Sequence, residues 1–69
     1  MAIKYISYYI LKSKYEDYLK GFTTDGKNYA IWTYVPEYAM RFTTEDKALE
    51  MQNELNGYVA SIEFVKEKI

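Results

Sequence analysis

The stretch GFTTDGK, residues 21–27, returns later in the chain as RFTTEDK, residues 41–47. In the first copy the acid is followed by Gly26, and an Asp-Gly pair readily adopts the positive φ angles of a tight hairpin. In the second copy the pair Thr43–Thr44 is followed by two acids, which is how a helix begins, with a hydroxyl cap and then negative charge in the first turn. The first copy therefore predicts a hairpin turn at Thr24–Lys27, and the second predicts the start of a helix.

The sequence around the two copies differs, so we interpret their similarity as coincidence and not as an internal repeat. Residues 28–35 follow the first copy and are rich in aromatic and β-branched residues, which favour a strand. The helix after the second copy should end at Asn56, with Gly57 in the left-handed conformation common after helices. Its core-facing residues are expected to be Ala48, Met51 and Leu55, with Leu49 and Gln52 beside them.

The N-terminal segment Ile3–Leu11 is typical of a strand, although both of its alternating faces carry apolar side chains. A turn should follow at Ser13–Glu16. Residues 14–20 also fit a short helix, because the ends of this turn have the spacing of a capping box, but a helix of about two turns has little stability alone. We favour the turn, followed by a second strand that ends at Phe22.

The third strand, Asn28–Val35, should end at Pro36, because proline has no N–H to donate to a sheet. We expect the link from Pro36 to the helix to contain an irregular turn that buries Ala39 and Phe42. Alternating side chains at Val59–Lys66 predict the last strand.

This order of elements, β-β-β-α-β, indicates a single α+β domain over residues 1–69, a mostly antiparallel four-stranded sheet with one helix packed on one face. We place the last strand beside the first, in the order 3-2-1-4. A right-handed crossover through the helix would then make the last strand parallel to the first and third.

The composition excludes most chemistry, because the chain of 69 residues has Cys 0 and His 0. Thiolate nucleophiles, structural zinc and the usual general base near neutral pH all need one of these residues. No glycine-rich phosphate loop or nucleophile elbow is present either. We expect a non-enzymatic protein with no cofactor and no metal, and oligomerisation is the route to extra stability that such a small domain keeps.

The charge is −1 in total, with five Lys against three acids in residues 1–34 and four basic residues against seven acids in residues 35–69. This distribution argues against general electrostatic binding of nucleic acid, which needs clustered cations. The uncharged run Tyr5–Leu11 is far shorter than the ~20 apolar residues of a membrane span, and no cationic start leads into a signal peptide. We therefore expect a cytoplasmic protein that does not enter a membrane.

Aromatic residues stand out, since Tyr is 9 and aromatics make up 19% of the chain. One helix covers only one face of a four-stranded sheet, so the other face should be open. Expected on the helix side are Ile6, Ile10, Ile31, Ile62 and Phe64, and expected on the open face are Tyr5, Tyr9, Trp32 and Tyr34.

Three interpretations of an aromatic open face compete. It can be a solvated surface with its hydroxyl groups in water, or an interface for a homodimer or a protein partner, where Tyr and Trp are enriched. It can also stack bases or nucleotides, with Lys4, Lys12, Lys20 and Arg41 as the phosphate partners.

A second candidate surface is the acidic stripe of Asp46, Glu50 and Glu54, which are spaced four residues apart on the outer face of the helix. Such a stripe is usually a solvated face. It could also present negative charge to a basic cleft in a host nucleic-acid enzyme, although steering of this kind needs a large field.

The stretch from Tyr18 to Ala48 resembles a loose group of very small proteins encoded by phages and prophages of low-GC Gram-positive bacteria. Their shared pattern is matched here by Tyr18, Leu19, Trp32, Thr33, Ala39, Phe42, Thr44, Glu45 and Ala48. The group has no single activity, so no residue role is carried over. The resemblance implies a context in which small proteins act by binding, for example by blocking host defence or host machinery, or by sequestering a signalling nucleotide.

We therefore predict a non-enzymatic binding protein of phage type, a homodimer or a blocker of a host protein, acting through Tyr5, Tyr9, Trp32, Tyr34 and Arg41 in the host cytoplasm. The alternative is a module that binds nucleotides or single-stranded nucleic acid by stacking on the same aromatic residues.

Overall fold

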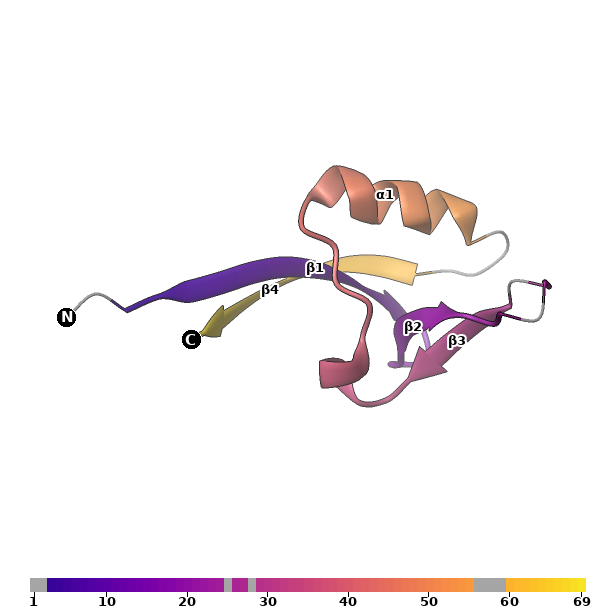
Figure 1. The fold of residues 1–69 in the computed structure, drawn as a ribbon, viewed down its shortest axis with the longest axis horizontal. Coiled ribbons are helices and arrows are strands. Elements are labelled where there is room, and N and C mark those ends of the chain that lie inside the picture. Colours follow the sequence, from indigo (N-terminus) through magenta and orange to yellow (C-terminus); the bar gives the residue numbers. More distant parts are fainter. Residues whose placement is uncertain (1–2, 25, 28, 56–59) are drawn as a thin grey trace.

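The computed structural model describes residues 3–24, 26, 27, 29–55 and 60–69. Its elements are β1 (Tyr5–Ser13), β2 (Tyr18–Phe22), β3 (Ala30–Thr33), the short 3-10 helix η1 (Pro36–Tyr38), α1 (Glu45–Glu54) and β4 (Ala60–Lys68). The strands form one open sheet in the order β3-β2-β1-β4, and α1 lies on one face of it (Figure 1). The predicted α+β class and the predicted strand order are both confirmed.

The two similar strings do have different structures. In the first, Gly26 has φ 87°, and the backbone N–H of Thr23 donates to the carbonyl of Tyr29 at 2.9 Å to close the reversal. In the second, the side chain of Thr44 accepts from the N–H of Lys47 at 3.3 Å and caps α1. These two predictions are confirmed by local backbone chemistry.

Other boundaries shift by a few residues or fall outside the described part of the chain. Strand β1 begins two residues later than predicted and continues to Ser13, where the predicted turn follows. Residues 18–20 are strand, so the short-helix alternative for residues 14–20 is wrong. The predictions for Asn28, Gly57 and Val59 concern residues outside the described ranges.

The link between β3 and α1 passes from one face of the sheet to the other. Ala39, just after η1, is buried against Tyr8 and Ile10 on the face away from α1. Three residues later, Phe42 is buried on the α1 side, against Leu11. The predicted burial of Ala39 and Phe42 is confirmed, but the two side chains lie on opposite faces.

This passage is possible because β1 and β2 diverge, so that the ladder between them is registered at Lys12 and Tyr18 alone. The link lies in the opening between the two strands. Phe42 and Tyr9 exchange two backbone hydrogen bonds, of 2.8 and 2.9 Å, and the N–H of Met40 donates to the carbonyl of Leu19 at 2.8 Å. The link thus supplies hydrogen-bond partners to backbone groups of β1 and β2 where the two strands no longer bond to each other.

The predicted direction of the last strand is wrong, because β4 runs antiparallel to β1 along all of its nine residues. The right-handed crossover rule assumes that a helix returns the chain to the start of the next strand. Here the link makes that return, and α1 then runs in the same direction as β1 (Figure 1). Strand β4 consequently begins at the end of β1 and runs back along it.

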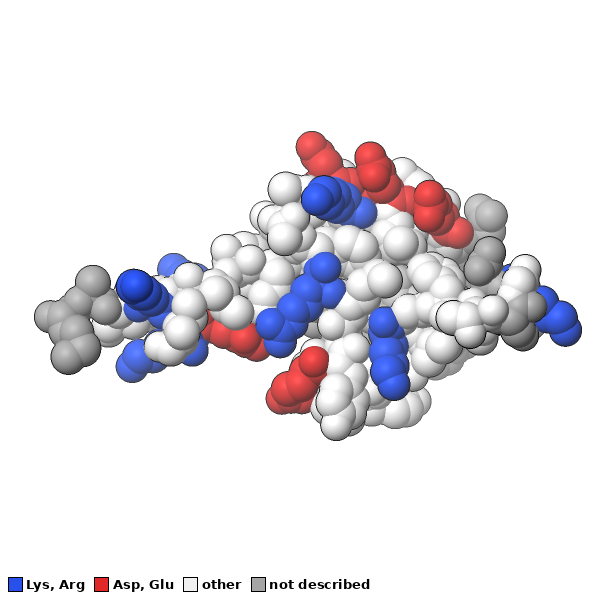
Figure 2. Space-filling view, viewed as in Figure 1, with Lys and Arg blue, Asp and Glu red and all other residues white. Residues whose placement is uncertain are grey.

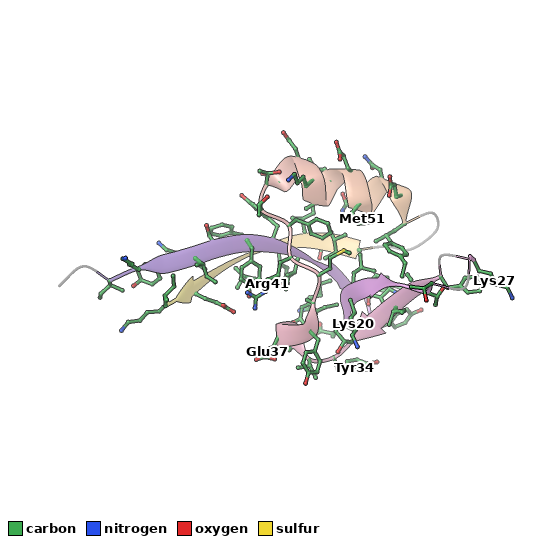
Figure 3. The ribbon with its side chains drawn as sticks, in the orientation of Figure 1. Lys20, Lys27, Tyr34, Glu37, Arg41 and Met51 are labelled. Carbon is green, nitrogen blue, oxygen red and sulfur yellow. The ribbon has the colours of Figure 1, made fainter. Side chains whose placement is uncertain are left out.

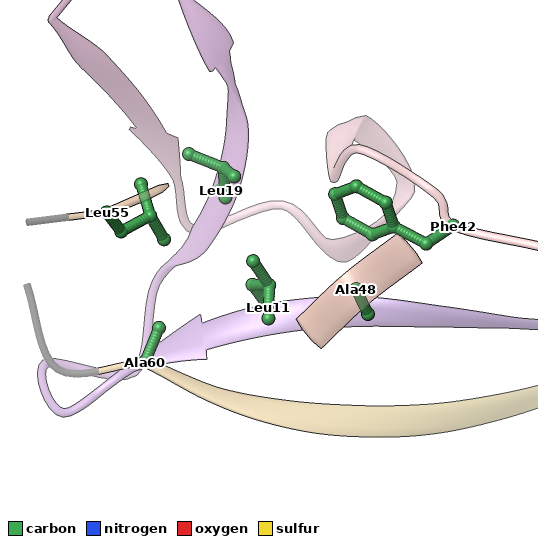
Figure 4. Close-up of a cluster of buried hydrophobic side chains, with 6 residues drawn as sticks. All are labelled: Leu11, Leu19, Phe42, Ala48, Leu55 and Ala60. Atoms are coloured by element: carbon green, nitrogen blue, oxygen red, sulfur yellow. The ribbon is translucent and has the colours of Figure 1, made fainter. Parts of the chain in front are cut away.

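The main core lies under α1. It contains Leu11, Leu19, Phe42, Ala48, Leu55 and Ala60, which come from two strands, the link, the helix and the start of β4 (Figure 4). Only Leu11 and Leu19 are large side chains that are completely buried among the described residues. The predicted helix stripe is confirmed, with Ala48 and Leu55 buried and Met51 packed against them.

The face assignments within β1 are wrong. Ile10, predicted on the helix side, packs with Tyr8 on the opposite face, and Ile6 on that face is exposed. Leu11 takes the place under α1 that was predicted for Ile10. Because successive residues of a strand point to opposite faces, this one-residue difference moves every side chain of β1 to the other side.

Replacing Thr44 with Ala should destabilise the domain by about 1 kcal/mol, since it removes the oxygen that caps the N–H of Lys47. The neighbouring Thr43 is exposed and lies one residue outside the cap, so Thr43→Ala is the matched control and should change stability by less than about 0.5 kcal/mol. Urea unfolding followed by circular dichroism measures both. Equal losses in the two variants would contradict the assignment of the cap.

Phe42→Ala should remove most of the stability of the domain. Truncation of a buried Phe costs about 3–5 kcal/mol, and a chain of this length is stable by only about 3–10 kcal/mol. The control is Tyr34→Ala, which truncates an aromatic ring that is 74% exposed. In thermal unfolding, the Tyr34 variant should melt near the temperature of the wild type. A Phe42 variant that also melts there would contradict the stabilising role of the buried Phe42 ring.

Candidate protein-binding surface

The four aromatic residues predicted on an open face do not share one. Tyr9 and Trp32 pack against the main core on the α1 side, so their predicted exposure on the other face is wrong. Tyr5 and Tyr34 are exposed, but one lies near the start of β1 and the other follows β3. The surface that remains is therefore built from different residues.

The most exposed part of the sheet is a two-stranded arm, which we define as residues 3–7 and 64–69. It extends past the N-terminal end of α1 and accounts for much of the 48 Å length of the molecule (Figure 1). Its strands are paired from Ser7 and Lys66 outward to Tyr5 and Lys68, and the N–H of Ile69 donates to the carbonyl of Lys4 at 2.9 Å. All of residues 3–7 are exposed.

Large apolar side chains stand on both faces of this arm. The exposed ones are Ile3, Tyr5, Ile6, Phe64 and Ile69. Phe64 is 59% exposed, although its ring lies against Tyr9 with centroids 5.3 Å apart. The ammonium group of Lys66 lies 4.6 Å from the ring centroid of Tyr5. A two-stranded ribbon without a packed layer on either side is marginally stable in water, so the arm is a surface that gains from being covered.

Sequence reasoning missed Phe64 as a surface residue. The prediction placed it in the core because it alternates with Glu63 in the same way as Ile62 does. Ile62 does pack against the core. Phe64, which pairs with Tyr9, lies beyond the part of the sheet that α1 covers. The exposure of Phe64 could have been predicted from the length of the helix. A helix of ten residues spans only about 15 Å, which is shorter than a strand of nine residues.

A second group of exposed side chains lies at the other end of the link. It comprises residues of β3, of η1 and of the segments next to β3, namely Tyr29, Ile31, Tyr34, Val35 and Tyr38. The ammonium group of Lys20 lies 5.8 Å from the ring centroid of Tyr38. Figure 3 shows Lys20, Tyr34 and Glu37 near one another around η1.

Arg41, which was predicted to bind a ligand, is exposed and contacts two side chains of the sheet. Its guanidinium carbon lies 4.2 Å from the ring centroid of Tyr8, and Nη2 is 3.9 Å from Oε1 of Glu67. The hydroxyl of Tyr8 donates to the same Oε1 at 2.6 Å. These three groups form a cluster on the face away from α1, to which the arm contributes Glu67.

The pKa of the Tyr8 phenol is raised above its ordinary value in this cluster. The main cause is its hydrogen bond to the Glu67 carboxylate, and burial adds to it. The positive charge of Arg41 opposes both by lowering the pKa. The cluster therefore holds Tyr8 as a neutral donor, an arrangement that fixes the ring in place.

The other predicted phosphate partners are also dispersed. Nζ of Lys12 lies 3.6 Å from carboxylate oxygens of Glu16 and Glu63, and these charges raise the pKa of Lys12. Lys4 lies on the arm and Lys20 beside η1. The structure therefore does not gather these cations with the aromatic residues into one site.

The acidic residues Asp46, Glu50 and Glu54 are exposed on α1. Figure 2 shows acidic side chains along the top of the helix and basic side chains at the end of the arm. The helix therefore presents mostly negative charge and the end of the arm mostly positive charge, whereas Lys12 and Arg41 are paired with carboxylates between them.

Comparisons with known proteins give no further guidance, since no protein-family model, curated protein or solved structure matches the chain. Among the described residues, no helix is long and apolar enough to cross a membrane. The same ranges contain no group of three or more acidic side chains that could hold a metal ion. The surface chemistry of the arm is therefore the best guide to function.

Glu67→Gln should lower the pKa of Tyr8, because the amide keeps a hydrogen-bond acceptor but removes the negative charge, leaving Arg41 to favour the phenolate. A raised pKa in the folded state makes wild-type stability fall as the pH rises above about 10, the ordinary tyrosine pKa. That fall should be smaller in the variant. Tyrosine ring resonances followed by NMR titration measure the pKa.

The matched control is Glu63→Gln, on the same face of β4 but paired with Lys12. It should leave the titration of Tyr8 unchanged. A wild-type Tyr8 that titrates at or below the pH of the exposed tyrosines would contradict the described cluster.

Proposed function

We propose that this chain is a non-enzymatic binding protein whose arm binds another protein surface. The first partner that we propose is a second copy of the chain. The observation that supports this proposal most directly is the exposure of apolar side chains on both faces of the arm, with Tyr5 and Phe64 at least half exposed. Contiguous exposed apolar surface on a small domain is typical of an interaction site. Aromatic anchors such as these carry much of the energy in protein interfaces.

The small core adds a reason for association. A standard interface buries about 800 Å² on each partner, which is a sizeable part of the 5310 Å² that this chain exposes. Any partner that binds only the folded state also stabilises it. If the chain is phage-encoded, as its resemblance to small phage proteins implies, a host protein is the natural further target of such a dimer.

Phe64→Thr should weaken self-association at least about tenfold, because the loss of an aromatic anchor costs about 1.4 kcal/mol or more. Threonine keeps the strand propensity at this position. The control Ile31→Thr removes an exposed apolar side chain from β3, away from the arm, and should leave the dissociation constant within about twofold to threefold. Light scattering during size-exclusion chromatography, over a range of protein concentrations, gives both values.

A wild-type chain that stays monomeric at its highest soluble concentration would contradict self-association. If it also purified with a bound ultraviolet-absorbing compound, the nucleotide-binding alternative would take its place. Equal weakening by the two substitutions would move the interface away from the arm.

A further inference from the structure

The outer edge of β4 presents backbone groups in a regular pattern. Tyr9 uses both its N–H and its carbonyl on Phe42, so it makes no backbone hydrogen bond to its β4 partner, Phe64. In an antiparallel pair the hydrogen-bonded and non-bonded residues alternate. The N–H and carbonyl groups of Ile62, Phe64 and Lys66 therefore point away from β1, toward an edge on which no strand lies in the described part of the chain.

One end of this edge is already closed by the protein itself. Nε2 of Gln52, on α1, donates to the backbone carbonyl of Ala60 at 2.6 Å. The carbonyl of Ala60 belongs to the same outward-pointing set as that of Ile62, two residues on. The edge that is open to a new strand thus begins after Ala60 and runs into the arm.

The side chains along this open edge are suited to self-pairing. The Phe64 ring is 59% exposed and lies against Tyr9. A two-fold axis perpendicular to the sheet, midway between two paired β4 strands and level with Phe64, would bring the Phe64 rings of two copies together and give a row of four aromatic rings with the two Tyr9 side chains. Aromatic pairs across neighbouring strands stabilise a sheet.

As a deepening of the proposed function, we infer that a second copy of this chain pairs with the outer edge of β4 in an antiparallel register centred on Phe64. In this register Ile62 lies opposite Lys66 of the second copy, and Glu63 lies opposite Val65. Like charges do not face each other anywhere along the pairing. The long aliphatic part of Lys66 can cover Ile62 while its ammonium group stays in water.

Charge excludes the neighbouring registers. A centre on Glu63 places that residue opposite itself, and a centre on Lys66 does the same for Lys66. A centre on Val65 places Glu63 opposite Glu67. Like charges directly opposite each other destabilise a sheet. A centre on Ile62 requires the edge at Ala60, where the side chain of Gln52 is already bonded.

The acidic side chains near the axis are also neutralised within each copy. Glu63 lies 3.6 Å from Nζ of Lys12, and Glu67 is held by Tyr8 and Arg41. The remaining cations at the end of the arm move apart in the dimer, because antiparallel pairing directs the two arms away from each other. Electrostatic repulsion between the copies is therefore small in this arrangement.

Disulfide crosslinking tests the register, and the absence of cysteine from the chain makes every new thiol unambiguous. Ile62→Cys and Lys66→Cys are made as two separate full-length proteins, mixed and oxidised. Opposite residues in a hydrogen-bonded pair have Cα atoms about 5.5 Å apart, within the range that a disulfide spans. We expect the mixed dimer to outnumber both self-crosslinked species, as measured by mass spectrometry.

Each variant alone is the control. In the inferred register two copies of residue 62, or of residue 66, are separated by four residues, about 13 Å along the strand, too far for a disulfide. Self-crosslinking of either variant that matches or exceeds the mixed product would overturn the register. Wild-type protein that is dimeric by light scattering, with no crosslink in any combination, would overturn the β4 edge but leave the proposed function intact, whereas monomeric wild-type protein would overturn both.

Discussion

The two backbone hydrogen bonds between Phe42 and Tyr9 are the interaction on which the rest of the structure depends. Strands β1 and β2 diverge after a single registered pair, and the backbone groups along the opening would otherwise lack partners inside the protein. Phe42 supplies those partners and also delivers its ring to the main core. The chain thereby reaches the second face of the sheet and starts α1 above the middle of β1.

This crossing divides β1 into two halves with different environments. The half near Leu11 has α1 above it and the link beneath it, so both faces are buried there. The half near Tyr5 has neither, because α1 runs away from it toward the start of β4. The exposure of the arm is thus a direct result of where the link crosses the sheet. A helix that started earlier along β1 would have covered Phe64 on the α1 face of the arm.

The parts of this fold that were predictable from sequence are those fixed by local chemistry. The cap at Thr44, the positive φ at Gly26 and the chain reversal after Ser13 each depend on a few neighbouring residues, and these signals were sufficient. The direction of β4 and the faces of β1 depend on the crossing link. Its decisive contact joins Tyr9 to Phe42, thirty-three positions apart in the chain, and no periodic pattern in the sequence announces it.

The residues of the exposed aromatic surface were only partly predictable from the sequence. Aromatic composition indicated a binding surface, yet Tyr9 and Trp32 belong to the packed side of the sheet. Both faces of β1 carry apolar side chains, so alternation could not decide which face α1 covers. Only the three-dimensional position of Leu11 under Ala48 resolves this ambiguity, and with it the identity of the exposed residues.

Pairing through β4 would also change what the acidic helix can do. A two-fold axis perpendicular to the sheet keeps both copies of α1 on the same face of a continuous sheet of eight strands, four from each copy. Three carboxylates on one helix create a weak field, but Asp46, Glu50 and Glu54 from two helices would act on one side of the dimer, with the basic arms at its two ends. Electrostatic attraction of a partner grows with the charge gathered on one face. Self-association through the arm and recognition of a basic partner through the helices are therefore compatible, because they use different surfaces and the first strengthens the second.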